Sequence, residues 1–217
     1  EEIREERGSQ ELDLPPCAVQ IILGTPDPRL YTVLPTDVQP LMPFSLNAPF
    51  VQDPARKEIK HPASSPTNAW LLERIGQLAG EAILGWLRND RMSLGERARA
   101  YELLPKSVES DGSLNKETSL IILKGLRRAI TSGQKVLLCH DGTLAEKGEA
   151  IDLPAAVHDT WGTEKVLQVF GQGKKKAIAR EIPARFIETL ETWALVQRLG
   201  VTDIARRLIL MNPGPPC

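Results

Sequence analysis

A long helix is the clearest element that the sequence predicts, and it lies in SPTNAWLLERIGQLAGEAILGWLRND (residues 65–90). Ser65 suits the cap of the first turn, and Pro66 suits the first helical position, where no backbone N–H is needed. Apolar residues then recur every three or four positions, at Leu71, Leu72, Ile75, Leu78, Ala79, Ala82, Ile83 and Trp86. They cover more than half of the helix circumference, so we expect this helix to be buried against neighbouring strands.

The residues before this helix predict a small sheet. Eleven of the 17 prolines lie between Pro15 and Pro66, and proline can neither continue a helix nor donate to a central sheet ladder. Three short strands are predicted at residues 18–23, 30–34 and 44–51. With the long helix they form a predicted strand-rich α+β domain at residues 1–108, which begins with a charged segment at 1–7.

The remaining residues, 109–217, predict a mostly helical domain with a short hairpin. A polar, turn-rich linker is predicted at 106–115, with a helix at 93–104 before it. Further helices are predicted at 116–130, 155–161, 164–170, 184–199 and 202–210. Strand 135–139, the Asp141-Gly142 turn and residues 150–153 form the predicted hairpin, Gly133 and Gly200 are predicted helix caps, and 212–217 a frayed tail. The predicted fold class is therefore α+β, with a small N-terminal sheet packed on a long helix and a mostly helical second half.

Charge and composition exclude several classes of protein. The 217 residues carry 27 Lys and Arg against 28 Asp and Glu, a formal net charge of −1. A general nucleic-acid binder needs a basic excess, so binding through Lys174–Lys176, Arg180 and Arg206-Arg207 is the least favoured hypothesis. No apolar run approaches the ~18 residues of a membrane-spanning helix. Three distant cysteines predict reduced thiols in a cytoplasmic protein, and a first residue of Glu predicts a piece of a longer polypeptide.

Three motifs suggest chemistry but are better explained otherwise. Cys139-His140-Asp141 offers a nucleophile beside a base, yet neighbours on a strand point to opposite faces, which disfavours proton transfer. The run Gly171–Lys176 lacks the spacing of a phosphate-binding loop, so an exposed basic turn between two helices is favoured. Residues 199–208 contain the parts of a helix-turn-helix in reversed order. No complete active site, no metal site and no enzyme activity are therefore predicted for this chain.

One loop remains a candidate site. It follows the strand that ends near Phe50 and carries Asp53, Arg56, Lys57 and Lys60 before the long helix begins. The adjacent cations Arg56 and Lys57 could contact a phosphate or carboxylate of another domain. The alternative is a solvated, proline-stiffened loop whose charges serve solubility.

The same part of the chain resembles the sacsin-type branch of the Hsp90-like ATPases, in the GHKL superfamily. The resemblance rests on Leu34-Pro35-Thr36, on Asn47-Ala48-Pro49-Phe50, on the pair Arg56-Lys57 and on the helix at 68–87. A second block, Val136–Thr143 followed by Ala150–Pro154, resembles a recurring segment of these proteins.

This resemblance implies a function in a larger protein. The chain would be a non-catalytic middle or transducer region, C-terminal to a nucleotide-binding domain, which relays nucleotide state to downstream segments of a chaperone-like or defence-associated protein. Arg56, or else Lys57, would reach the terminal phosphate of ATP held upstream with Mg²⁺. The family's Glu-x-x-x-Asn and Asp-x-Gly-x-Gly motifs are missing, and Asp141-Gly142-Thr143 lacks the second glycine, so no ATP binding by this chain itself is expected. The alternative function is a protein–protein interaction module without any link to nucleotide.

Overall fold

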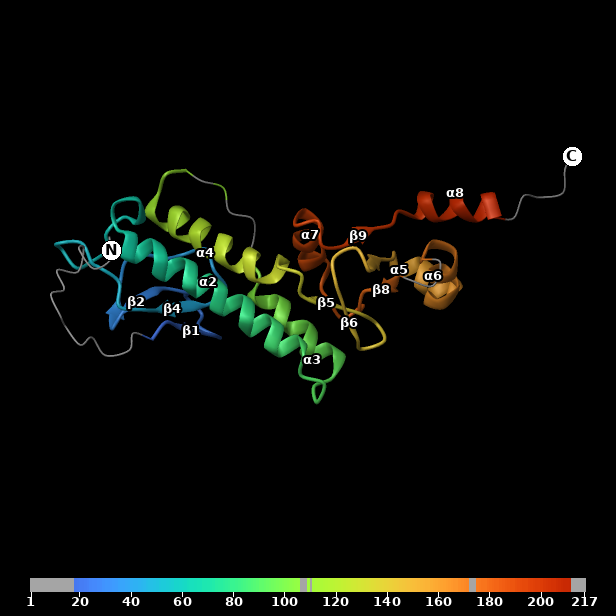
Figure 1. Ribbon diagram of the computed structural model, residues 1–217, viewed down its shortest axis with the longest axis horizontal. Helices are drawn as coiled ribbons and strands as arrows, with labels where there is room; N and C mark the ends of the chain where they lie inside the picture. Colours follow the sequence, from blue (N-terminus) through green and yellow to red (C-terminus); the bar gives the residue numbers. More distant parts are fainter. Residues whose placement is uncertain (1–17, 106–108, 110, 172–174, 212–217) are drawn as a thin grey trace, which may run out of the picture. The chain divides into compact units, whose positions relative to one another are not determined.

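The computed structural model describes residues 18–105, 109, 111–171 and 175–211 (Figure 1). The mixed α+β class that the sequence predicts is confirmed. The chain forms two compact units: Glu1–Ile83 with Glu102–Ser132, and Leu84–Tyr101 with Gly133–Cys217. The predicted boundary, between residues 108 and 109, does not coincide with this division. The helix that follows the predicted linker belongs to the first unit.

A four-stranded sheet forms one part of the first unit. Its strands are β1 (Gln20–Ile22), β2 (Leu30–Thr32), β3 (Leu34–Pro35) and β4 (Ser45–Asn47), in the spatial order β1-β4-β2-β3. β1 pairs antiparallel with β4, β4 parallel with β2, and β2 antiparallel with β3.

The prediction of one strand at residues 30–34 is wrong. Val33 has a φ of +88°, which ends β2 and turns the chain so that Leu34 pairs back with Thr32. A positive φ is unusual for a β-branched residue, and nothing in the composition of LYTVL announces it. The third predicted strand, 44–51, is shorter than expected and covers Ser45–Asn47.

The long predicted helix is confirmed as α2 (Pro66–Leu87). Ser65 caps it as expected, because its Oγ accepts the N–H of Asn68 at 3.2 Å. Most of the predicted apolar face is buried, with at most 1% of the residue surface exposed at Leu71, Leu72, Ile75, Ala79 and Ile83. The sheet contributes Leu30 and Leu46, both fully buried, to the core of the unit.

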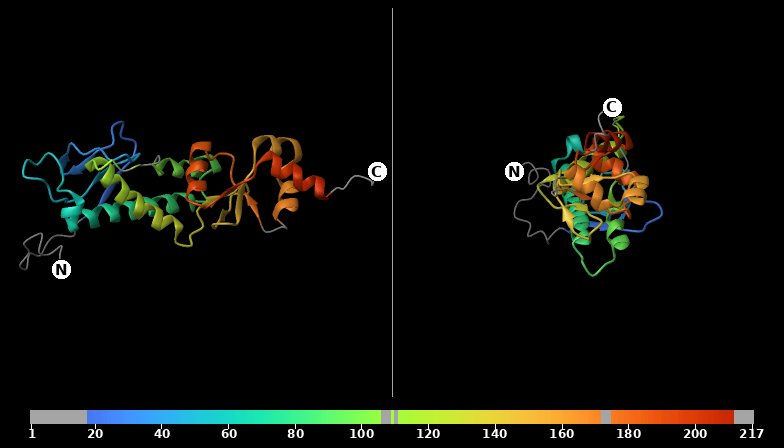
Figure 2. Two further views of the ribbon diagram at one scale, coloured as in Figure 1. Left: turned by 90° about the horizontal axis from the view of Figure 1, so that it is seen from above. Right: turned by 90° about the vertical axis from the view of Figure 1, so that its right-hand side faces the viewer.

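Helix α4 (Leu114–Thr131) lies beside α2 (Figures 1 and 2). It begins two residues before the predicted start, because Ser113 caps it by accepting the N–H of Lys116. The two backbones approach very closely: a Cβ on Gly76 would lie 2.1 Å from the carbonyl oxygen of Ile122, and one on Gly125 would lie 2.3 Å from that of Glu73. Glycine is therefore required at this crossing for steric reasons.

In the second unit, the first element after α2 is α3 (Leu94–Ala98), which begins with a Ser93–Glu96 capping box. The 3-10 helix η2 (Arg99–Leu103) follows, and its last two residues belong to the first unit. Two buried polar side chains hold this unit together. Arg97 donates to the carbonyl oxygens of Leu87 and Gly142, both at 2.8 Å. The Tyr101 hydroxyl donates to the carbonyl of Val136 at 2.6 Å and accepts the N–H of Leu138 at 2.9 Å.

The strands of the second unit pair differently from the prediction. β5 (Leu137–Leu138) forms its hairpin with β6 (Leu144–Ala145), whereas β7 (Ala150–Asp152) pairs in parallel with β8 (Lys176–Ala177) and β9 (Gln197–Arg198). The expectation that 150–153 pairs back across the Asp141-Gly142 turn is therefore wrong. The turn closes a shorter hairpin, and parallel partners of β7 come from residues much later in the chain.

Helices α5 (Ala155–Trp161), α6 (Thr163–Gly171) and α8 (Val201–Met211) agree with the predicted ones. The predicted helix 184–199 does not extend so far: α7 (Ala184–Thr192) ends before Ala194, whose φ is +54°, and the chain then enters β9. Gly133 has the positive φ, +71°, expected after a helix. Gly200 instead precedes α8, and its N–H donates to Asp203 Oδ2 at 3.2 Å.

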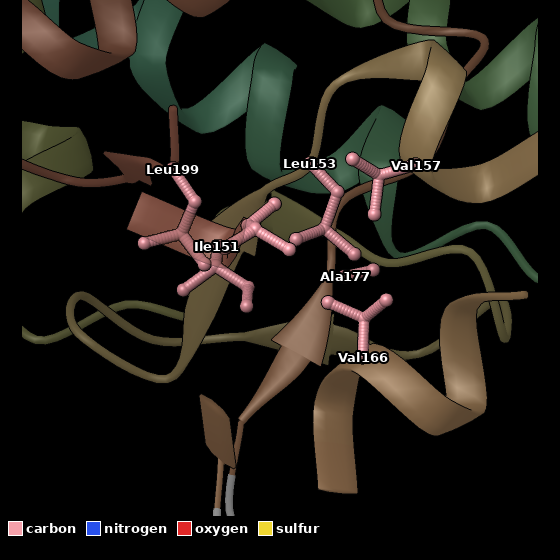
Figure 3. Close-up of a cluster of buried hydrophobic side chains, with 7 residues drawn as sticks. Ile151, Leu153, Val157, Val166, Ala177 and Leu199 are labelled. Atoms are coloured by element: carbon pink, nitrogen blue, oxygen red, sulfur yellow. The ribbon is translucent and has the colours of Figure 1, made fainter. Parts of the chain in front are cut away.

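A cluster of apolar side chains forms a core around the parallel strands of this unit (Figure 3). Its buried members are Ile151, Leu153, Val157, Val166, Ala177, Leu199 and Ile204. They come from β7, β8, α5, α6, α8 and the residues that follow β7 and β9, so the cluster joins most of the elements that follow residue 150.

Some predictions concern residues outside the described ones. These are the charged segment 1–7, the tail 212–217 and part of the predicted linker. Across the described ranges, no helix has both the length and the apolar character needed to cross a membrane.

Candidate functional site

The predicted site is a short loop that projects between β4 and α2. Gln52 and Ile59 form an antiparallel bridge at its base. The N–H of Lys60 donates to the carbonyl of Val51 at 2.8 Å, and the N–H of Asp53 to that of Glu58 at 3.1 Å. The loop is therefore a closed turn with its own hydrogen bonds, rather than a solvated segment without structure.

Asp53 organises the inside of this turn. Its Oδ1 accepts the N–H groups of Lys57 at 3.0 Å and Glu58 at 3.1 Å, and its Oδ2 accepts the N–H of Ala55 at 3.2 Å. These bonds, the one from Glu58 first, favour the ionised carboxylate and hold the pKa of Asp53 below its usual value. Asp53 thus shapes the loop and has little capacity left for a ligand.

Asn68 anchors the loop to the first turn of α2. Its Oδ1 accepts the N–H of Val51 at 2.8 Å, and its Nδ2 donates to the carbonyl oxygens of Val51 and Lys60, both at 2.8 Å. The side chain is fully buried. An amide that satisfies three backbone groups on both arms of the loop fixes where the loop leaves the helix.

Arg56 and Lys57 lie at the tip of this braced turn. Both are exposed, and among the described residues neither side chain has a hydrogen-bond or ion-pair partner. Their backbone is held: Arg56 has a φ of +57°, and the carbonyl of Lys57 accepts the N–H of Asp37 at 2.8 Å. The structure thus presents two adjacent cations on a defined backbone, from which charge-assisted hydrogen bonds to an anion could be made.

A shallow cavity of about 560 Å³ lies beside the loop, lined in part by Asp53, Glu58, Lys60 and His61. Neither Arg56 nor Lys57 lines it. Its charged groups are of both signs, so the cavity does not favour an anion.

The Cys139-His140-Asp141 motif has no catalytic geometry. Cys139 is buried, and burial raises the pKa of its thiol to about 11. The carboxylate of Asp141 accepts the N–H and hydroxyl of Thr143, at 3.0 and 2.6 Å. The thiol is therefore protonated at neutral pH. His140 and Asp141 lie in a turn that follows the isolated bridge at Cys139, so the argument from side chains that alternate along a strand does not apply to them.

The basic run 171–176 is only partly described, because residues 172–174 lie outside the described ones. Lys176 lies in β8, so the predicted turn between two helices is wrong at this position. Its ammonium is 3.3 Å from Asp141 Oδ2 and 2.5 Å from the hydroxyl of Thr143, and that of Lys175 donates to the carbonyl of Gly148. Both lysines are therefore engaged within the unit and do not form a free cationic patch.

Residues 199–208 do not form a helix-turn-helix, because β9 lies between α7 and α8. Within the part of the chain that the structure describes, no group of three or more His, Cys, Asp or Glu side chains could hold a metal ion.

Reasoning from the sequence identified the cations of the loop and placed Asp53 among its charged residues, but it missed that Asp53 and Asn68 position the loop. Asp53 had a usable signal, since an Asp at the start of a polar turn commonly accepts the N–H groups that follow it. Asn68 had a weaker one, a polar residue in the first turn of an otherwise apolar helix. Comparison of the chain with protein-family models, curated proteins and solved structures found no match.

Proposed function

We propose that this chain is the non-catalytic transducer region of a sacsin-like, Hsp90-type ATPase. In this proposal Arg56, with Lys57 beside it, contacts a phosphate of ATP that an upstream domain of the same polypeptide holds with Mg²⁺. The chain then relays the nucleotide state to downstream segments. The support is the resemblance in sequence described above together with the form of the loop.

The braced loop tip is the observation that carries the proposal. A contact that forms when two domains meet needs a cation whose backbone position is already set, because ordering a mobile loop would cost free energy at that moment. Asp53 and Asn68 set the backbone, while the side chains of Arg56 and Lys57 keep no partner among the described residues. The proposal places the protein in the cytoplasm, with protein segments rather than nucleic acid or membrane as its partners.

The test uses the longer polypeptide and measures steady-state ATP hydrolysis. We expect Arg56→Ala to lower turnover by about 10²-fold while nucleotide affinity stays nearly unchanged, as for the loss of one donor that acts in the transition state. Arg127→Ala, which removes an exposed cation of α4, is the matched control and should leave turnover unchanged. Equal turnover in the wild type and Arg56→Ala would contradict the proposed role.

A second measurement tests the assignment of ATP binding to the upstream domain. Isothermal titration of this 217-residue chain with ATP and Mg²⁺ should show no binding. A micromolar site in the isolated chain would refute the non-catalytic assignment.

An interaction module without a nucleotide link is the second candidate, and exposed apolar side chains favour it. The neighbours Val33 and Leu34 are 88% and 72% exposed, and exposed apolar side chains that lie together often serve protein contacts. If this candidate is right, Arg56→Ala leaves hydrolysis by the longer polypeptide unchanged, and Leu34→Lys weakens binding of a partner protein.

A further inference from the structure

The two edges of the four-stranded sheet are protected very differently. β3 forms one edge; it has two residues, and one of them is Pro35, which has no backbone N–H to offer. β1 forms the other edge, within the run AVQIIL (residues 18–23), which contains no charge, proline or glycine. Sheet edges without such features readily pair with another strand.

The backbone of β1 offers pairing groups at its centre. On β4, the N–H of Leu46 donates toward β2, to Arg29 at 3.0 Å. Because neighbouring residues of a strand direct their backbone groups to opposite sides, Ser45 and Asn47 face β1, and their register partners Ile22 and Gln20 face β4. Ile21 lies between these two, so its N–H and C=O point away from the sheet. No strand of the described residues pairs with them.

The side chains of this edge are also poorly covered. Ile22 is 41% exposed and Leu23 46% exposed, while Val19 and Ile21 are only half-buried. Apolar groups are therefore accessible on both faces of the edge strand, which is unusual for a strand that has no further partner.

We propose that β1 pairs antiparallel with β1 of a second copy of this chain, so that the two sheets join into one. The two-fold axis passes between the two Ile21 residues. The N–H of each Ile21 donates a hydrogen bond to the C=O of Ile21 in the other copy. Val19 of each copy then lies opposite Leu23 of the other. An identical strand fits this arrangement because a two-fold interface is complementary to itself.

Charge favours a second copy as the occupant. The run 18–23 is uncharged, and the whole chain has a formal net charge of −1, so two copies approach without strong repulsion. A strand rich in charged residues would have to bury them beside Ile22 and Leu23, at a large desolvation cost.

The contrast between the edges also sets the size of the assembly. After β1 has paired, the remaining edges of the joined sheet are the two β3 strands, and each is short and blocked by Pro35. Pairing therefore ends at two copies and does not continue into a fibre. This inference does not depend on the proposed nucleotide contact.

The experiment measures molar mass by sedimentation and by light scattering over a range of protein concentration. The proposed interface consists of one short strand from each copy and is therefore small, so we expect a dimer Kd between about 1 μM and 1 mM. The wild-type chain should pass from 24.0 kDa to twice that mass as its concentration rises. A mass that stays at 24.0 kDa at millimolar concentration, or that grows beyond two copies, overturns the proposal.

Two variants locate the interface. Ile21→Pro removes an N–H that the β1–β4 ladder does not use, and should lower the dimer fraction to the monomer baseline. Ile22→Lys places a charge at the edge, should have the same effect, and decides the matter if Ile21→Pro does not fold by circular dichroism. Leu34→Lys, at an exposed apolar residue of the blocked edge, is the control and should still dimerise. Dimers that persist in Ile22→Lys, or that are lost in Leu34→Lys, overturn the assignment to β1.

Discussion

Replacing Gly76 by alanine should destabilise the protein, although the same change at Gly85 of the same helix should stabilise it. A Cβ at residue 76 would lie 2.1 Å from the carbonyl oxygen of Ile122 and 2.8 Å from the amide nitrogen of Leu126. Both are backbone atoms of α4, so no side-chain rotation can relieve the overlap. Ordinary van der Waals contact begins near 3.4 Å, so the two helices would have to separate by roughly 1 Å at their crossing.

The magnitude follows from two opposing effects. Alanine gains about 1 kcal/mol over glycine in a helix interior. Overpacking costs about 1–3 kcal/mol or more, and a gap of about 0.5–1 Å already forfeits a quarter to a half of each dispersion contact around it. We expect the steric cost to exceed this gain, so that the free energy of unfolding falls by about 1–2 kcal/mol.

Gly85→Ala is the matched control, because residue 85 lies in the same helix, is exposed and has no atom of another element within 4 Å of the position that a Cβ would take. It should raise the stability by about 0.5–1 kcal/mol. Urea unfolding followed by circular dichroism compares both variants with the wild type. If Gly76→Ala were as stable as Gly85→Ala, the close crossing of α2 and α4 would be refuted.

Three further predictions concern the loop and the buried polar groups. Asn68→Ala removes three hydrogen bonds to the backbone of the loop and should cost about 3 kcal/mol in urea unfolding; a loss below about 1 kcal/mol would contradict the anchoring role. The pKa of Asp53 is lowered in the folded state, so its contribution to stability is present above the unfolded pKa and is lost as the pH falls through the still lower folded value; the amide NMR signal of Glu58 should shift in that acidic range, and Asp53→Asn should abolish this shift. Burial raises the pKa of Cys139 to about 11, so in a variant with no other cysteine, alkylation near neutral pH should be slow until urea unfolds the chain; rapid alkylation of the folded protein would show that the thiol is accessible.

Local signals were sufficient where a structure depends on neighbours in the chain. The serine before Pro66 and the regular apolar spacing predicted α2 nearly to the residue. The cations of the loop could also be selected from the sequence, because they lie between a predicted strand and a capped helix. The role of Asn68 in holding this loop could not be predicted, because its three hydrogen bonds reach backbone groups 17 and 8 residues away.

Errors arose where one residue's backbone or a distant partner decides the outcome. The φ of Val33 divides a predicted strand, and the φ of Ala194 accompanies the end of a predicted helix. β7 was expected to pair with the strand before it, yet it pairs with β8 and β9, whose aligned residues lie 26 and 46 positions later. Such pairings depend on how apolar groups as far apart in the chain as Val157 and Ile204 pack together. The spacing of apolar residues within one segment does not indicate which distant segment it packs against.

The sequence by itself therefore determined most of the helices, the α+β class and the position of the candidate loop, because caps, proline and apolar spacing act within a few residues. The tertiary structure alone decided the close crossing of α2 and α4, the order of the strands and the open edge at β1. These depend on backbones that meet across long stretches of chain. Whether residue 76 must be glycine, and whether the neutral run at 18–23 is free to pair with another strand, depends on which segments the fold places beside them.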